Sequence, residues 1–308
     1  MQAVAAARKP PAAPARTRAR STALFRGFLA LCALAVVAIN IDGADYYLAS
    51  LATRVRHPMH AWLKPSGLIG QSLGLFAAAL FFFLWLYPIR KKYSARLSAT
   101  GSVGTWLDWH VSAGLMIPLL AATHAGWRFT GLVGLGFLAM FLVWLSGIVG
   151  RYLYVHIPRR RDGLAMSRDE IKSERNRILF EFTAATGLRP GFVRDTLGRE
   201  TESLEGMGPI GVLRAMIRSD FERRRAVRAI EKELSRPGAP PIDRATLNSV
   251  LKLARKELSL AHQARMLGST LKLFKYWHVA HRPFAVTALF AVITHIVVAI
   301  VFRATWFY

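Results

Sequence analysis

Four histidines in two apolar segments have the spacing of paired ligands. His110 and His124 lie fourteen residues apart in one segment, and His281 and His295 lie fourteen residues apart in another. Fourteen residues of α-helix fall about 40° short of four turns and rise about 21 Å, so each pair would share one face of its helix. Histidine in the hydrocarbon layer of a membrane is costly and usually functional, and imidazole is a common ligand of iron.

The apolar residues are concentrated in five long segments. Hydrophobic residues make up 53% of the 308 residues of the chain. A helix needs about 20 apolar residues to cross the hydrocarbon core of a bilayer. The sequence therefore predicts an all-α membrane protein with about five transmembrane helices, and a lipid bilayer as its surroundings. The predicted spans cover residues 22–41, 67–88, 106–127, 131–156 and 275–303.

The basic residues predict the orientation of these spans. All but five of the 42 Lys and Arg fall on the side of the N-terminus. The five exceptions are Arg54, Arg56, Lys64, Arg128 and Arg303. Because cytoplasmic loops carry the excess of Lys and Arg, we expect a cytoplasmic N-terminus and a periplasmic C-terminus in the inner membrane. The third and fifth spans then both run outward, which pairs His110 with His281 near the inner face and His124 with His295 near the outer face.

Two pairs of histidines stacked across a bilayer are what two haem b groups require. A haem with histidine on both axial positions has no open site and passes electrons. Cys32 is the only cysteine, so a cysteine-ligated cluster is excluded and a redox group must be held by other residues. We therefore predict a four-helix haem-binding core in which the four histidines are the iron ligands. The alternative is a bundle whose histidines hydrogen-bond neighbouring helices, as in a transporter.

His278 is an alternative to His281 as the inner ligand. It lies three residues before His281 and seventeen before His295. Seventeen residues of helix would turn His278 about 100° away from His295. This geometry favours His281.

Several residues near these histidines are candidate haem contacts. Gly114 follows His110 by four residues on the same helix face, where a missing side chain would let a flat macrocycle approach the backbone. Arg128 and Arg282 follow an outer and an inner ligand and could pair with haem propionates, although arginine is common at membrane boundaries. Gly70 and Gly74 have the spacing of a helix-packing face.

The region between the fourth and fifth spans is polar and predicts helices. Residues 167–170 fit a capping box, and residues 211–234 and 245–267 have helical periodicity. His262 lies on such a polar helix and is expected to be solvated. His156, beside a run of arginines, is expected at the membrane interface, with a haem propionate contact as the alternative.

These patterns define four expected segments. They are a disordered basic tail (1–20), four transmembrane helices (21–157), a basic helical cytoplasmic region (158–270), and the fifth transmembrane helix with a short C-terminus (271–308). The cytoplasmic region has no Walker motif. Its final helix can continue into the fifth span without interruption.

The histidine pattern resembles a known family. Two H-x13-H helices in a four-helix core resemble the ferric reductase-like transmembrane domain, which is shared with NADPH oxidases. The stretch YWHVAHRPF, followed by His295, is similar to bacterial cytochrome b561-like proteins. The resemblance covers about residues 65–157 and 275–303. It implies that His110, His124, His281 and His295 ligate haem and that electrons cross the membrane from a cytoplasmic flavin donor.

The sequence as a whole predicts an oxidoreductase component rather than a complete enzyme, because no flavin or nicotinamide domain is recognisable. We expect an acidic cytoplasmic flavoprotein or iron–sulfur protein to dock on the basic region and a periplasmic molecule to accept the electrons. One alternative is a quinone-linked cytochrome b subunit that anchors a larger oxidoreductase. Another is a non-redox membrane protein with a basic interaction region. The basic region also carries many acids, so no nucleic-acid partner is expected.

Overall fold

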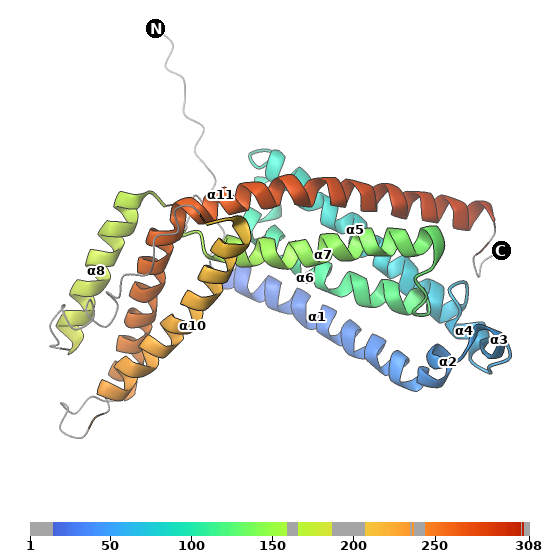
Figure 1. Cartoon of the computed structure of the whole chain (residues 1–308), viewed down its shortest axis with the longest axis horizontal. Coiled ribbons are helices and arrows are strands. Elements are labelled where there is room, and N and C mark those ends of the chain that lie inside the picture. Colours follow the sequence, from blue (N-terminus) through green and yellow to red (C-terminus); the bar gives the residue numbers. More distant parts are fainter. Residues whose placement is uncertain are drawn as a thin grey trace, which may run out of the picture. The chain divides into compact units, whose positions relative to one another are not determined.

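The computed structural model describes residues 15–158, 166–186, 207–234, 236, 244–302 and 304. Every regular element in this part of the chain is a helix, which confirms the predicted all-α class (Figure 1). The chain divides into two compact units. The first, called here the membrane unit, comprises Met1–Val149 and Val279–Tyr308, and the second, the helical unit, comprises Gly150–His278.

Among the described residues, four helices are long and apolar enough to cross a membrane. These helices are α1 (Ala15–Asp42), α5 (Leu68–Lys92), α7 (Gly131–Val155) and α11 (Arg244–Val301). They coincide with four of the five predicted spans, and the chain is a multi-pass membrane protein. The helix α1 begins inside the segment predicted to be a disordered tail, and residues 1–14 lie outside the described residues.

The remaining predicted span, the third (residues 106–127), corresponds to α6 (Val103–His124), which is not among those four helices. This helix packs against α1 and α5, and Ala113, Leu120 and Thr123 are fully buried on it. Because neighbouring helices cover much of its surface, α6 does not need apolar side chains all round. It therefore accommodates Asp108 and two histidines that would be costly on a helix facing lipid.

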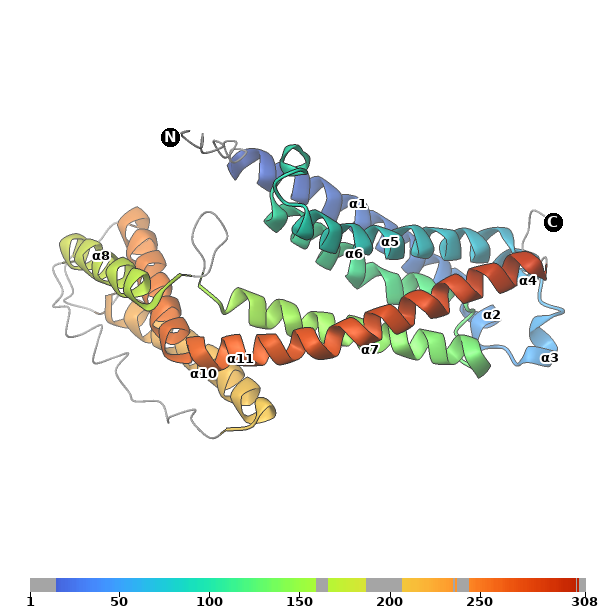
Figure 2. The same ribbon diagram turned by 90° about the horizontal axis from the view of Figure 1, so that it is seen from above.

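The membrane unit has two groups of helices. The first group is α1, α5 and α6, and the second is α7 with the C-terminal part of α11, which run side by side in both views (Figures 1 and 2). Apolar side chains from both groups form one core. Its buried members are Leu29, Val36, Ala77, Leu80, Phe81, Ala113, Met116, Ile117, Leu120, Met140 and Ala288.

Three short helices lie between α1 and α5. They are α2 (Ala44–Leu48), α3 (Leu51–Arg54) and α4 (His60–Leu63). Arg54 is buried here and donates hydrogen bonds to the carbonyl oxygens of Gly126, at 2.9 Å, and of Tyr47. Its guanidinium lies 4.8 Å from the centre of the Tyr46 ring. These contacts fasten the short helices to the turn that follows α6.

The helical unit contains α8 (Arg168–Thr186), α10 (Pro209–Leu234) and the N-terminal part of α11. The predicted capping box is confirmed, since Ser167 N donates to Glu170 Oε2 at 2.8 Å and Glu170 N donates to Ser167 Oγ at 3.2 Å. The helix α11 continues through both units without interruption. Apolar residues at helical spacing on α8, α10 and α11 form the core, which includes Leu179, Phe182, Val227, Ile230, Val250, Leu251, Ala254 and Leu258.

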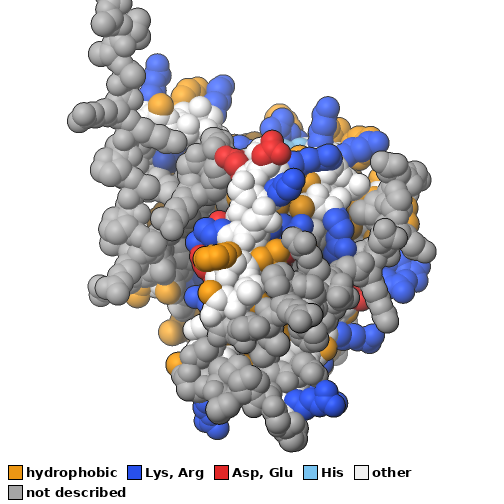
Figure 3. Space-filling view, turned by 90° about the vertical axis from the view of Figure 1, so that its left-hand side faces the viewer, with side chains coloured by type: hydrophobic (Ala, Val, Ile, Leu, Met, Phe, Trp, Pro, Cys, Tyr) orange, Lys and Arg blue, Asp and Glu red, His pale blue; other side chains and the backbone are white. Residues whose placement is uncertain are grey.

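The surface of the helical unit is rich in charge. Figure 3 shows Lys and Arg side chains on the visible face, with a few Asp and Glu among them. Hydrogen bonds from Arg177 and Lys256 lower the pKa of Glu174 to about 2. Elsewhere on this unit, α10 and α11 line a shallow pocket with four arginines. The pocket residues are Arg223, Arg224, Val227, Arg228, Glu231, Arg255 and Ser259.

Candidate functional site

The structure brings His124 and His295 together. The centres of their rings are 6.1 Å apart, and the ring planes are inclined by 73°. His124 is the last residue of α6, and His295 lies near the C-terminal end of α11. The two residues therefore come from the two different helix groups of the membrane unit.

The ring of His124 is held against α5. Its Nδ1 lies 2.8 Å from the carbonyl oxygen of Gly70. A carbonyl only accepts hydrogen bonds, so Nδ1 carries the proton and Nε2 keeps the lone pair. One turn further along α5, a Cβ on Gly74 would lie 2.6 Å from two atoms of the same ring. The predicted glycine face is thus the surface on which the imidazole rests.

His110 and His281 have the same tautomer. Nδ1 of His110 lies 3.0 Å from the carbonyl oxygen of Leu84. Nδ1 of His281 lies 2.7 Å from Ser146 Oγ, whose own proton goes to the carbonyl of Val143. Each Nδ1 therefore donates, and each Nε2 keeps the lone pair. The structure packs His110 against α5 and His281 against α7.

The other predicted site residues lie in different surroundings. A Cβ on Gly114 would meet only Leu84 Cδ1, at 3.9 Å, so the surface of α6 is open at this position. The guanidinium of Arg128 donates to the carbonyl of Ala49 at 3.2 Å, and Arg282 is exposed. His278 belongs to the helical unit, and its Nδ1 lies 3.3 Å from the carbonyl of Phe274 one turn back.

Three of the four predicted ligands have the second-nitrogen contact that is typical of metal-ligating histidines. Histidines that ligate metals usually donate the N–H of their second nitrogen to an oxygen acceptor, which fixes the ring and makes the ligating nitrogen more basic. His110, His124 and His281 each have such an acceptor on a neighbouring helix. His295 has no such acceptor among the described residues. Its ring lies edge-to-face beside the ring of His124.

A second cluster of titratable groups was missed by sequence reasoning. His262 was expected to be solvated, but this expectation is wrong, because the side chain is buried where α10 and α11 pack together. His156 is also buried, and its Nε2 lies 3.1 Å from Asp220 Oδ2. Burial alone would raise the pKa of Asp220, but hydrogen bonds from Tyr152 and His156 outweigh this effect and lower it. The sequence signal for this cluster was the pair of polar residues at 219–220, which interrupts the apolar face of a periodic helix.

Comparisons with family models, with curated proteins and with solved structures found no match to this chain. The fold therefore defines the chain as a multi-pass, all-α membrane protein, and any functional assignment depends on the geometry of its own residues.

Proposed function

We propose that this chain is a membrane b-type cytochrome that carries electrons across the cytoplasmic membrane through two bis-histidine haems. The proposal includes a cytoplasmic N-terminus, a periplasmic C-terminus, a cytoplasmic flavoprotein or iron–sulfur donor and a periplasmic acceptor. The orientation rests on the Lys and Arg residues, all but five of which fall on one side of the predicted spans.

The approach of His124 to His295 is the observation that carries the proposal. An imidazole nitrogen lies about 2 Å from a metal ion that it ligates, so two rings on one ion have their centres about 6 Å apart. The observed separation is 6.1 Å. Spacing and charge in the sequence had paired the same two residues, although 171 positions separate them along the chain.

The chain's own residues would act by holding the ligands still. A haem ligated by histidine on both faces supplies one-electron transfer and has no open position for substrate. The carbonyls of Gly70 and Leu84 and the hydroxyl of Ser146 fix three of the imidazoles. Rings fixed in this way need little reorganisation when the charge at the iron changes. His295 is exposed on α11, and the hydrocarbon layer of the membrane would keep water from it.

The surface of the helical unit supports an acidic electron donor. The arginine-lined pocket on α10 and α11 presents several guanidinium groups together. Such a surface speeds the diffusional encounter with a negatively charged protein, and this effect weakens as salt is added. The donor would therefore be a protein with an acidic face around its redox group.

Absorption spectra of the detergent-purified protein, oxidised and dithionite-reduced, test the proposal directly. We expect the bands of haem b and about two haems per chain. A colourless protein, obtained from cells supplied with ample haem, would contradict the proposal. The histidines would then serve as hydrogen-bonding groups between helices.

Substituting Gly74 with alanine should disturb the outer pair of histidines. The new Cβ would lie 2.6 Å from Cε1 and Nδ1 of His124, so the ring must move away from its acceptor on Gly70. We expect lower occupancy or a shifted potential for one haem only, measured by redox titration of the spectrum. Gly147→Ala is the control, because a Cβ there meets nothing within 4 Å. Equal spectra for both variants would contradict the prediction.

A further inference from the structure

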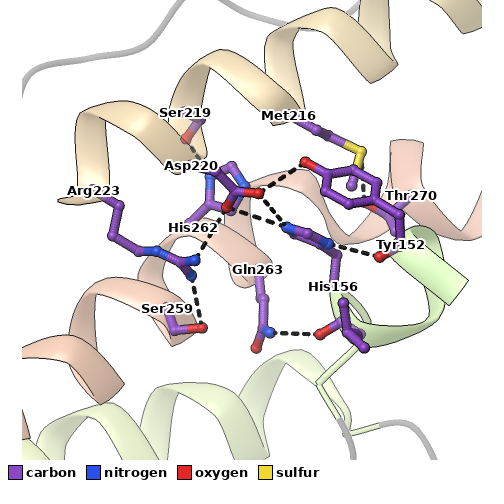
Figure 4. A network of polar contacts seen from close by, with 11 residues as sticks. Tyr152, His156, Met216, Ser219, Asp220, Arg223, Ser259, His262, Gln263 and Thr270 are labelled. Atoms are coloured by element: carbon purple, nitrogen blue, oxygen red, sulfur yellow. Dashed lines mark hydrogen bonds and ion pairs between the residues drawn. The ribbon is translucent and has the colours of Figure 1, made fainter. Parts of the chain in front are cut away.

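Three side chains in the helical unit converge on one point. An inference from them is independent of the proposed function. They are His156, which follows α7, Asp220 on α10 and His262 on α11 (Figure 4). One ligand atom from each lies within 4.8 Å of the other two. His156 and His262 are 7% and 4% exposed, so both imidazoles are largely shielded from water.

His156 has an oxygen acceptor at each ring nitrogen. Its Nδ1 lies 2.8 Å from the carbonyl of Tyr152, and its Nε2 lies 3.2 and 3.1 Å from the two oxygens of Asp220. A carbonyl and a carboxylate both only accept hydrogen bonds. Either a second proton or a cation must therefore lie between Nε2 and Asp220.

His262 adds the observation that favours a cation. Its Nδ1 lies 2.7 Å from Ser219 Oγ, whereas its Nε2 is buried and has no hydrogen-bond partner. A buried polar atom without a partner costs stability and usually indicates a missing water or ion. The centres of the His156 and His262 rings are 6.1 Å apart, so the two imidazoles are close neighbours.

Asp220 completes a set of two nitrogens and one oxygen. It also accepts a hydrogen bond from the hydroxyl of Tyr152 at 2.9 Å and pairs with Arg223 at 3.1 Å. The Arg223 pair uses Oδ1 and the Tyr152 hydroxyl donates to Oδ2, so a cation would bind Oδ2 through its second lone pair. The positive charge of Arg223 would weaken cation binding but also holds the carboxylate in place.

We propose that His156, Asp220 and His262 bind one divalent transition-metal ion, of which zinc is the best match. Two imidazoles and one carboxylate form a common protein ligand set for Zn²⁺, with the fourth position left to water or to a nearby side chain. Such an ion would tie together the end of α7, α10 and α11 within the helical unit. The site lies outside the membrane unit and uses none of the four predicted haem ligands.

Zinc titration of the full chain in detergent tests this site. The protein is stripped with a chelator and titrated with ZnCl₂ against a coloured chelator, and bound zinc is measured by elemental analysis so that iron does not interfere. We expect one zinc per chain. His262→Gln and Asp220→Asn should each weaken zinc binding about 100-fold, because each removes one ligand of the ion. Substitutions around metal sites reduce metal affinity by up to about this factor.

His57→Gln is the matched control. His57 also pairs with a carboxylate, since its Nε2 lies 3.0 Å from Asp45 Oδ2, but the described residues contain no third ligand there. This variant should bind zinc as the unsubstituted protein does. The proposal is overturned if the unsubstituted protein binds no zinc tightly, or if His262→Gln retains the same affinity. Hydrogen exchange of residues 209–234 provides a second measurement on the unsubstituted protein. Zinc should slow the exchange, and no change would also overturn the proposal.

Discussion

Replacing His295 with alanine is expected to lower the haem content from about two groups per chain to about one, because a bis-histidine haem needs both ligands. His124→Ala should have the same effect, since the ring centres of these two residues lie 6.1 Å apart. The remaining haem should still be reduced by dithionite. Pyridine haemochrome assay and redox titration of the purified variants measure both results.

The inner pair supplies the matching experiment. His281→Ala should remove the other haem and leave the one that His124 and His295 would hold. His278→Ala should retain both haems, because its Nδ1 contacts a carbonyl of its own helix and its side chain belongs to the helical unit. If the His124 and His295 variants each keep two haems, the predicted pairing is wrong. If His278→Ala loses a haem and His281→Ala does not, His278 is the inner ligand.

The apolar spans were predictable because the bilayer imposes a length and a composition on each helix. Four of the five predicted segments coincide with helices that are apolar enough to cross. The exception, α6, shows the limit of hydropathy, since a helix covered by its neighbours can carry polar residues. The capping box at 167–170 was predictable because both of its hydrogen bonds are local.

Short helices between α1 and α5 were less predictable. The first helix ends before Gly43, and the chain then forms α2, α3 and α4. A Cβ on Gly43 would lie 2.7 Å from Leu63 Cδ1, so the break depends on close packing with a residue twenty positions away. Arg54 was counted only as a loop charge, although it is buried. Its partners become apparent only when the chain is folded.

The pairing of His124 with His295 was predictable from helix spacing and orientation, but the surroundings of the rings were not. The Gly70 carbonyl and the flat surface at Gly74 depend on the register of α5 against α6. The cluster at His156 and His262 joins residues 106 positions apart in helices whose polar positions look solvated in sequence. Periodicity predicts which face of a helix is apolar, but it does not predict which polar residue meets a partner inside the core.

Loss of Arg175 is expected to destabilise the helical unit by about 2–3 kcal/mol, because it leaves a buried carboxylate without its cation. Glu257 is 2% exposed, and both of its hydrogen bonds come from Arg175, at 2.9 and 2.7 Å to Oε1. Its other oxygen is buried without a partner. The side chain of Arg175 is 33% exposed, which lowers the effect below the roughly 3–5 kcal/mol that breaking a fully buried pair costs. Hydrogen exchange of residues 244–262 in the full chain would measure the change after Arg175→Met.

Two further variants separate this buried charge from a general loss of surface charge. Arg177 lies two residues after Arg175 on α8. It pairs with Glu174 and Glu181, but its side chain is 56% exposed. Arg177→Met should therefore have a much smaller effect on stability than Arg175→Met. The double variant Arg175→Met with Glu257→Leu should recover most of the lost stability, because a buried ion pair is often replaced by apolar residues without cost. If Arg175→Met and Arg177→Met change the exchange rates equally, the pair has no special role. The helical unit would then owe its stability to its apolar core alone.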